Sequence, residues 1–285
     1  MINATNFCIL FQITVAKVTQ YSVFGLVIGK TLYAFMFNFI ALFVTWKVNR
    51  RQFSRTVKLL LASFATNIFV AFSVASLSFY LFHDKFIRTW YFSGHLSLVT
   101  FFLVCSSTNM FLVTVDRYLL VVRGSWYLRW KKNFHCISCT LTFITSGFVI
   151  PLYFVLRECS SSFAVVNLSV LAVYLYGTLF GSLLTNIVMM RFIRKQMSQI
   201  GSSRPNLKKK VSKTVCIMTV SVGFFQFLLA LLVTLLTISY TMENFVVKFR
   251  SGLIISSIIV SLFKCSTFPF IYIVRNSQVR KYLSD

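Results

Sequence analysis

Acidic residues are nearly missing from this chain of 285 residues, which has five Asp and Glu against 29 Lys and Arg. With so few carboxylates and only three His residues, no catalytic or metal-binding cluster can be identified, so we expect no enzyme, metal or cofactor. Charged residues make up 12% of the chain, far less than the surface of a soluble domain of this length needs. The shortage of charge therefore argues against a soluble globular protein.

Apolar residues are abundant, at 57% of the chain, and they occur in runs too long for soluble helices. A helix needs about 20 apolar residues to cross a bilayer, and its backbone groups must then be hydrogen-bonded internally. The sequence predicts an all-α membrane protein: a seven-transmembrane helix bundle over 23–274, after an extracellular N-terminus (1–22) and before a cytoplasmic tail with a short amphipathic helix (275–285). The predicted spans are 23–46, 57–82, 92–122, 134–156, 163–192, 210–239 and 249–274.

The basic residues are distributed unequally between the two sides of this topology. The odd-numbered connections and the tail hold 21 of them, the other side holds six, and Lys30 and Lys264 fall within spans. Such an excess marks the cytoplasmic side, so we expect the N-terminus outside and no role in nucleic-acid binding. Asn3-Ala4-Thr5 is a glycosylation acceptor that fits an exterior N-terminus.

Two motifs carry a family resemblance. Asp116-Arg117-Tyr118 lies at the inner end of the third span, before a basic loop, and Phe268-Pro269-Phe270-Ile271-Tyr272 lies near the inner end of the seventh. They resemble the Asp-Arg-Tyr and Asn-Pro-x-x-Tyr signatures of rhodopsin-like G-protein-coupled receptors, with Phe in place of Asn. The resemblance implies a plasma-membrane receptor in which Asp116, Arg117, Tyr118, Pro269 and Tyr272 form the switch that couples to a heterotrimeric G protein.

Weaker matches predict a polar network inside the bundle. Asn38, Asn67 and Ser106 fall where the family has its span-one asparagine, its span-two aspartate and a span-three serine. Lys264 falls beside the family's sodium pocket, and its spacing from Pro269 does not match that of the retinal-binding lysine. We hypothesise that its ammonium replaces the sodium ion, hydrogen-bonded by Asn67, Ser106 and Asn38. A neutral lysine or a water-filled cavity is the open alternative.

The resemblance also implies an extracellular ligand among the outer helix halves, for which Val99, Thr100 and Gln226 are the candidate contacts. The third-span position of amine receptors falls near Val99, which disfavours a biogenic amine and leaves an orphan or chemosensory receptor. The basic inner loops suit anionic membrane lipids as well as a cytoplasmic partner. No Asp or Glu occurs between Glu158 and Glu243, so we expect a weak resting lock on Arg117 and appreciable basal activity.

Several departures from the family keep other functions open. Phe225-Gln226-Phe227-Leu228 stands where the family has Cys-Trp-x-Pro, the fifth span has no proline, and Cys159 lacks its usual partner near Phe92. A non-signalling receptor-like scaffold would fit these losses. A seven-helix transporter or channel is the other alternative, although transport usually requires several ionisable residues along a path and only Lys30 and Lys264 lie within spans.

Overall fold

Long helices make up the structure, a computed structural model that describes 17–49, 55–82, 89–123, 161–199, 205–241, 247–276 and six isolated residues (Tyr127, Thr140, Thr142, Gly147, Val279 and Tyr282). Within these residues, six helices are long and apolar enough to cross a membrane. They are α2 (Lys17–Val48), α3 (Arg55–Phe82), α4 (Thr89–Val122), α7 (Ser161–Gln199), α8 (Pro205–Thr241) and α9 (Val247–Arg275). The protein is therefore a helical, multi-pass membrane protein.

Six of the seven predicted spans coincide with these helices. Of the predicted fourth span, 134–156, only Thr140, Thr142 and Gly147 are described, and all three are helical. The predicted tail helix also lies largely outside the described residues, as does Asn3. Helices α7 and α8 extend beyond the predicted 163–192 and 210–239, because the segments that flank these spans remain helical past the apolar core.

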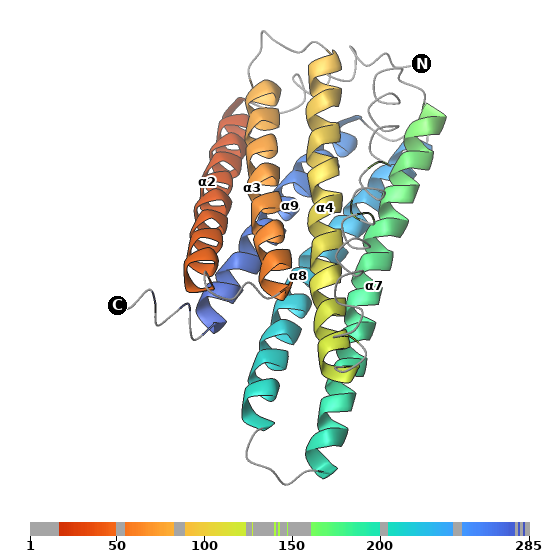
Figure 1. Cartoon of the computed structure of the whole chain (residues 1–285). Coiled ribbons are helices and arrows are strands. Elements are labelled where there is room, and N and C mark those ends of the chain that lie inside the picture. Colours follow the sequence, from red (N-terminus) through yellow and green to blue (C-terminus); the bar gives the residue numbers. More distant parts are fainter. Residues whose placement is uncertain are drawn as a thin grey trace.

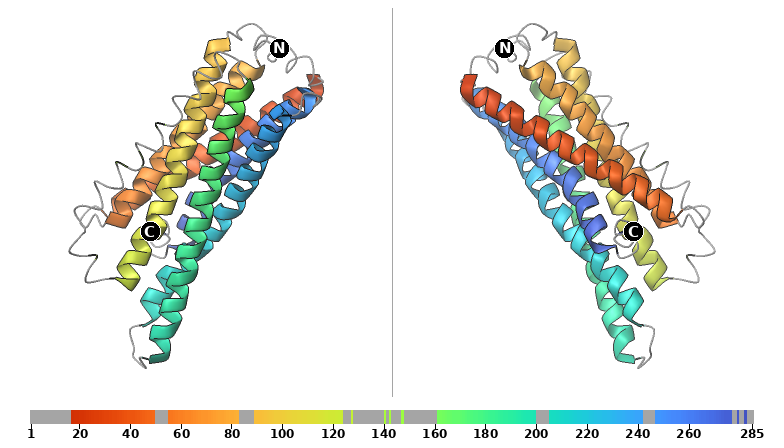
Figure 2. Two further views of the ribbon diagram at one scale, coloured as in Figure 1. Left: turned by 90° about the vertical axis from the view of Figure 1, so that its right-hand side faces the viewer. Right: turned by 90° about the vertical axis from the view of Figure 1, so that its left-hand side faces the viewer.

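The helices are arranged as a closed ring. Each contacts the next in the order α2, α3, α4, α7, α8 and α9, and α9 returns to contact α2 (Figures 1 and 2). Helices α2, α4, α7 and α9 end at the bottom of Figure 1, where α3 and α8 begin. Because α4 and α7 run in the same direction, residues 123–161 connect opposite ends of the bundle.

We call this lower end the basic end. It carries eight described basic side chains near helix termini: Lys47, Lys58, Arg117, Arg123, Arg191, Arg194, Lys195 and Arg275. Figure 2 shows that α7 and α8 project together beyond the other helices at this end. Two lysines with described side chains, Lys30 and Lys264, lie within the apolar length of the bundle instead.

Polarity is inverted relative to that of a soluble protein. Large apolar side chains such as Phe72, Val173 and Leu184 point outward, with at least 64% of their surface exposed. Buried positions include Asn38, Asn67 and Lys264, together with many serines and threonines. The hydroxyls of these serines and threonines mostly donate to backbone carbonyls three or four residues earlier, as Ser63 does to Leu59 at 2.9 Å. An apolar exterior around an interior that contains polar side chains among apolar ones is the distribution expected in a bilayer.

Candidate functional site

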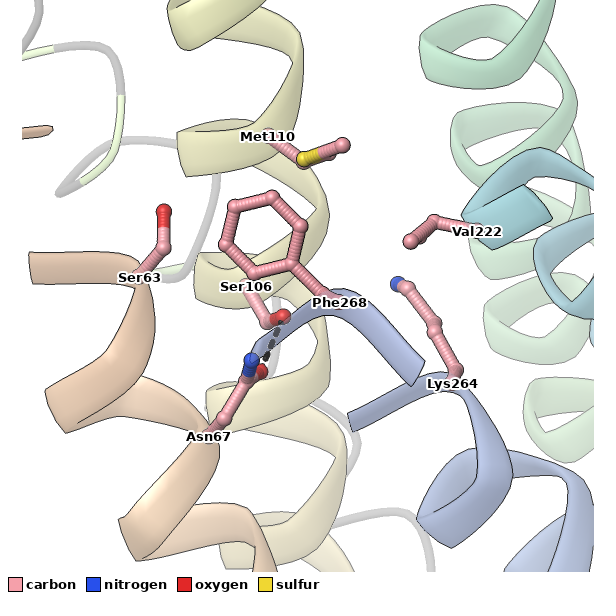
Figure 3. A pocket seen from close by; sticks show the side chains of 7 residues that line it. All are labelled: Ser63, Asn67, Ser106, Met110, Val222, Lys264 and Phe268. Carbon is pink, nitrogen blue, oxygen red and sulfur yellow. Dashed lines mark hydrogen bonds between the residues drawn. The ribbon is translucent and has the colours of Figure 1, made fainter. Parts of the chain in front are cut away.

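A small polar cavity lies at the centre of the ring, between α3, α4, α8 and α9. Its lining consists of Ser63, Asn67, Ser106, Met110, Val222, Lys264 and Phe268 (Figure 3). The volume open to the centre of a water-sized sphere is about 10 Å³, which is room for about one water molecule. The cavity thus brings together three of the four residues of the predicted polar network.

Asn67 and Ser106 connect α3 to α4 at this cavity. The Ser106 hydroxyl donates to Asn67 Oδ1 at 2.7 Å, and both side chains are buried (Figure 3). One helical turn toward the basic end, Asn109 Nδ2 donates to Thr66 Oγ1 at 3.3 Å. Since lipid offers no competing hydrogen bonds, these polar pairs fix the relative position of the two helices.

Lys264 reaches the same cavity from α9, and 2% of its surface is exposed. Its Nζ donates to Ser107 Oγ at 2.5 Å, and Ser107 in turn donates to the Leu103 carbonyl at 2.9 Å. The hypothesis that Asn67, Ser106 and Asn38 hold this ammonium is therefore wrong about its hydrogen-bond partner. The reason is rotational: Ser107 is turned by about 100° from Ser106 on α4 and faces α9.

Asn38 connects α2 to α9 at a place where a proline leaves a backbone carbonyl without its usual helical donor. Pro269 lies inside α9 and has no N–H to donate to the carbonyl of Cys265, four residues earlier. Asn38 Nδ2 donates to this carbonyl at 3.0 Å and to the Ala34 carbonyl of its own helix at 2.7 Å. Asn38 thus belongs to a separate contact, in which its amide satisfies the acceptor left by Pro269.

The Asp-Arg-Tyr segment lies at the basic end of α4. Asp116 is 1% exposed and accepts a hydrogen bond from the Tyr127 hydroxyl. Tyr127 itself is 4% exposed and its backbone N–H donates to the Arg123 carbonyl at 2.8 Å. A continuous helix would hold positions 116 and 127 about 16 Å apart, so Tyr127 does not lie on a straight continuation of α4.

Arg117 is half-buried between α4 and α9. Its guanidinium interacts electrostatically with Asp116, Tyr272 and Tyr127, whereas its buried Nε has no hydrogen-bond partner. The predicted neutralisation by Asp116 therefore acts through the field of the carboxylate, and Tyr127 is the hydrogen-bond donor to Asp116. Tyr118 lies half-buried on the same turn.

Tyr272 brings the second motif to Arg117. It is 6% exposed, lies beside Thr45 and Asn276, and packs on the Phe64 ring with centroids 5.4 Å apart. Phe268 packs on the same ring at 5.3 Å. Phe64 of α3 thus holds Phe268 and Tyr272 of the second motif, and Tyr272 interacts electrostatically with Arg117 of the first motif, 155 residues earlier in the sequence.

The three candidate ligand contacts do not share a cavity. Val99 is packed into the main apolar cluster and Thr100 is buried, but neither lines the central cavity or its neighbour. Gln226 lines the neighbouring cavity between α4, α7 and α8, and its Nε2 donates to the Leu175 carbonyl at 3.0 Å and to Thr178 Oγ1 at 2.7 Å. Its amide therefore connects α8 to α7.

Two functional contacts were not expected from the sequence: Ser107 with Lys264, and Tyr127 with Asp116. Ser107 could have been found as the neighbour of Ser106 on an adjacent helix face, but Tyr127 gives no periodic signal. A comparison of the sequence with protein-family models and with curated proteins finds no match to either.

Proposed function

We propose that this protein is a rhodopsin-like G-protein-coupled receptor. The observation that carries the proposal is that Arg117 on α4 and Tyr272 on α9 lie close enough to interact electrostatically at the basic end of the bundle. These residues belong to two motifs chosen independently from the sequence. Their convergence at the end that the charge distribution assigns to the cytoplasm is what a coupling switch requires.

The full architecture of this proposal has a seventh span at 134–156, an extracellular N-terminus, a cytoplasmic tail and a location in the plasma membrane. The parallel course of α4 and α7 supports the additional span, because the residues between them lead from one end of the bundle to the other. The excess of basic residues in the connections and tail assigned to the basic end, 21 against six on the other side, supports the orientation.

In the resting state of the proposed receptor, Arg117 is kept at the bundle interior by the charge of Asp116 and by the neighbouring Tyr272. Coupling needs a second helix arrangement in which Arg117 is released toward the G protein, and a ligand shifts the equilibrium by binding the two arrangements with different affinity. The sequence between Glu158 and Glu243 has no carboxylate that could hold Arg117 from α7 or α8. The resting arrangement is therefore weakly held, and we expect appreciable basal activity.

The ligand in this proposal enters the half of the bundle opposite the basic end. Val99, Thr100 and Gln226 are the candidate contacts, of which Gln226 must then exchange a hydrogen bond to α7 for one to the ligand. An apolar, chemosensory type of ligand fits the cluster of Val99, Leu103 and Leu229 better than a cationic amine does.

The test measures ligand-free nucleotide exchange on heterotrimeric G proteins in membranes that contain the full chain, with surface expression quantified in parallel. We expect a basal signal for the wild type, its loss in Arg117→Ala and its retention in the matched control Arg123→Ala. Arg123 is a basic neighbour on the same helix end whose side chain is exposed rather than half-buried. Equal background signals in all three would contradict the weakly held switch and its basal activity and would favour the non-signalling scaffold.

A further inference from the structure

The charge of Lys264 has no carboxylate partner in the middle of the bundle. Asp116 is the one acidic residue among those the structure describes, and it lies nine positions, or about 14 Å, from Ser107 along α4. The remaining four acidic residues fall between helices or after α9: Asp84, Glu158, Glu243 and Asp285. An ammonium that is 2% exposed in a membrane-spanning bundle therefore has only a neutral hydroxyl opposite it.

The hydrogen bonds around the cavity leave donors in excess. A lysine ammonium has three N–H donors, and among the described residues that of Lys264 contacts one acceptor, Ser107. Asn67 accepts from Ser106 through Oδ1, while its Nδ2 has no acceptor in the described part of the chain. The hydroxyls of Ser63 and Ser106 already donate elsewhere. The unused N–H groups of Lys264 and Asn67 belong to side chains that line the same cavity (Figure 3).

The rest of the lining cannot compensate a positive charge. Met110, Val222 and Phe268 are apolar, and a buried ion without a counter-charge is strongly unfavourable. A partner that satisfies these donors and balances the charge of the ammonium accepts hydrogen bonds, carries negative charge and has a volume not much larger than that of one water molecule. Polyatomic anions such as sulfate or gluconate exceed that volume.

We propose that this cavity is a binding site for a monatomic anion of the chloride class, held by the Lys264 ammonium and the Asn67 amide. Bound there, the anion neutralises the intramembrane charge and connects α3 to α9 next to the Ser106–Asn67 hydrogen bond. The site concerns the stability of the bundle and does not depend on whether the protein couples to a G protein.

The experiment measures the unfolding temperature of the purified full-length chain in lipid nanodiscs while chloride is replaced by gluconate at constant ionic strength and constant sodium. With chloride at ten times its dissociation constant, the wild type should unfold about 3–6 °C higher in chloride than in gluconate, and bromide should substitute for chloride. Potassium in place of sodium should change nothing, since the bound ion is the anion.

Two variants localise the effect. Lys264→Met should abolish the difference between chloride and gluconate, whereas the matched control Lys30→Met should keep it. Lys30 is the second intramembrane lysine, and its Nζ is 4.1 Å from the centroid of the Phe263 ring rather than in the cavity. Equal unfolding temperatures of the wild type in the two anions, or a difference that survives in Lys264→Met, would overturn the proposal.

Asn67→Leu provides a second readout, because this variant removes the amide donor and leaves Lys264 and its charge in place. Loss of the amide donor should raise the chloride concentration at half-maximal stabilisation by about tenfold, the effect of one hydrogen bond to a charged group. A midpoint that is unchanged from that of the wild type would contradict the proposed coordination.

Discussion

Replacing Asn38 by alanine is expected to destabilise the bundle, because it removes the donor to a carbonyl that has no helical partner. The Ala34 carbonyl, 2.7 Å from Asn38 Nδ2, loses little in this variant, since it belongs to regular α2. The Cys265 carbonyl, 3.0 Å away, depends on Asn38 because Pro269 cannot donate to it. A buried acceptor without a partner costs about 1–3 kcal/mol, and interhelical hydrogen bonds in bilayers contribute up to about 1.7 kcal/mol. We expect a loss of about 1–2 kcal/mol.

Asn186→Ala is the matched control for this loss. Asn186 is 3% exposed, and its Nδ2 donates to the Ser182 carbonyl of its own helix at 3.0 Å. Its Oδ1, like that of Asn38, is buried without a hydrogen-bond partner. The two asparagines therefore differ mainly in the contact of Asn38 with α9. The free energy of unfolding should fall by about 1 kcal/mol more in Asn38→Ala than in the control.

A double-mutant cycle with Pro269→Ala isolates the cause. An alanine at 269 restores an N–H that can donate to the Cys265 carbonyl within α9, so Asn38→Ala should cost about 1 kcal/mol less in that background. Unfolding can be followed with a thiol-reactive dye, because Cys105 and Cys265 are buried in the folded protein. The reasoning is refuted if Asn38→Ala costs the same in both backgrounds, or if Asn186→Ala is equally damaging.

Two further changes test helix packing by the same measurement. At Gly181 a Cβ would lie 3.0 Å from a ring carbon of Phe111, so Gly181→Ala should lower the free energy of unfolding by about 1–3 kcal/mol. At Gly29 nothing lies within 4 Å of the Cβ position, so Gly29→Ala should be neutral or stabilising by up to about 1 kcal/mol. Equal effects of the two alanines would contradict close α4–α7 packing. Gln226→Leu should lower the free energy of unfolding by about 1 kcal/mol, because it removes the hydrogen bonds to α7. The loss should be non-additive with that of Thr178→Val, which removes one of the acceptors. Additive losses would show that the two side chains are not coupled.

The helices were predictable because the bilayer imposes a minimum length and an apolar composition on each span. Six predicted spans match helices for this reason, and they differ mainly at the ends, where the polar flanks of α7 and α8 continue as helix. Hydropathy reports burial in lipid, but a helix that projects into water is under no such constraint. The projecting ends of α7 and α8 therefore had no signal of the kind that located the spans.

Three of the four residues of the predicted polar network line the cavity, whereas Asn38 does not, and the hydrogen bonds of Lys264 were not predictable. The positions of Asn67, Ser106 and Lys264 along their helices place them at similar depth, and all three line the cavity. Which neighbour Lys264 contacts depends on the rotation of α4 about its axis, and the adjacent Ser106 and Ser107 are both plausible from spacing. The helix orientation, set by packing of whole faces, selects Ser107.

The positions of proline decide where the backbone of this bundle has an unsatisfied carbonyl. Among the described residues, proline interrupts only α9, at Pro269, while Pro205 begins α8 and leaves its interior regular. In α8, Gln226 donates to the Leu175 carbonyl of α7, and Gly223 allows Leu179 of α7 to approach to 3.1 Å of a Cβ position. A hinge in α8 therefore has no backbone cause here. The weak point lies in α9, next to Lys264 and Tyr272, where Asn38 compensates for the missing N–H.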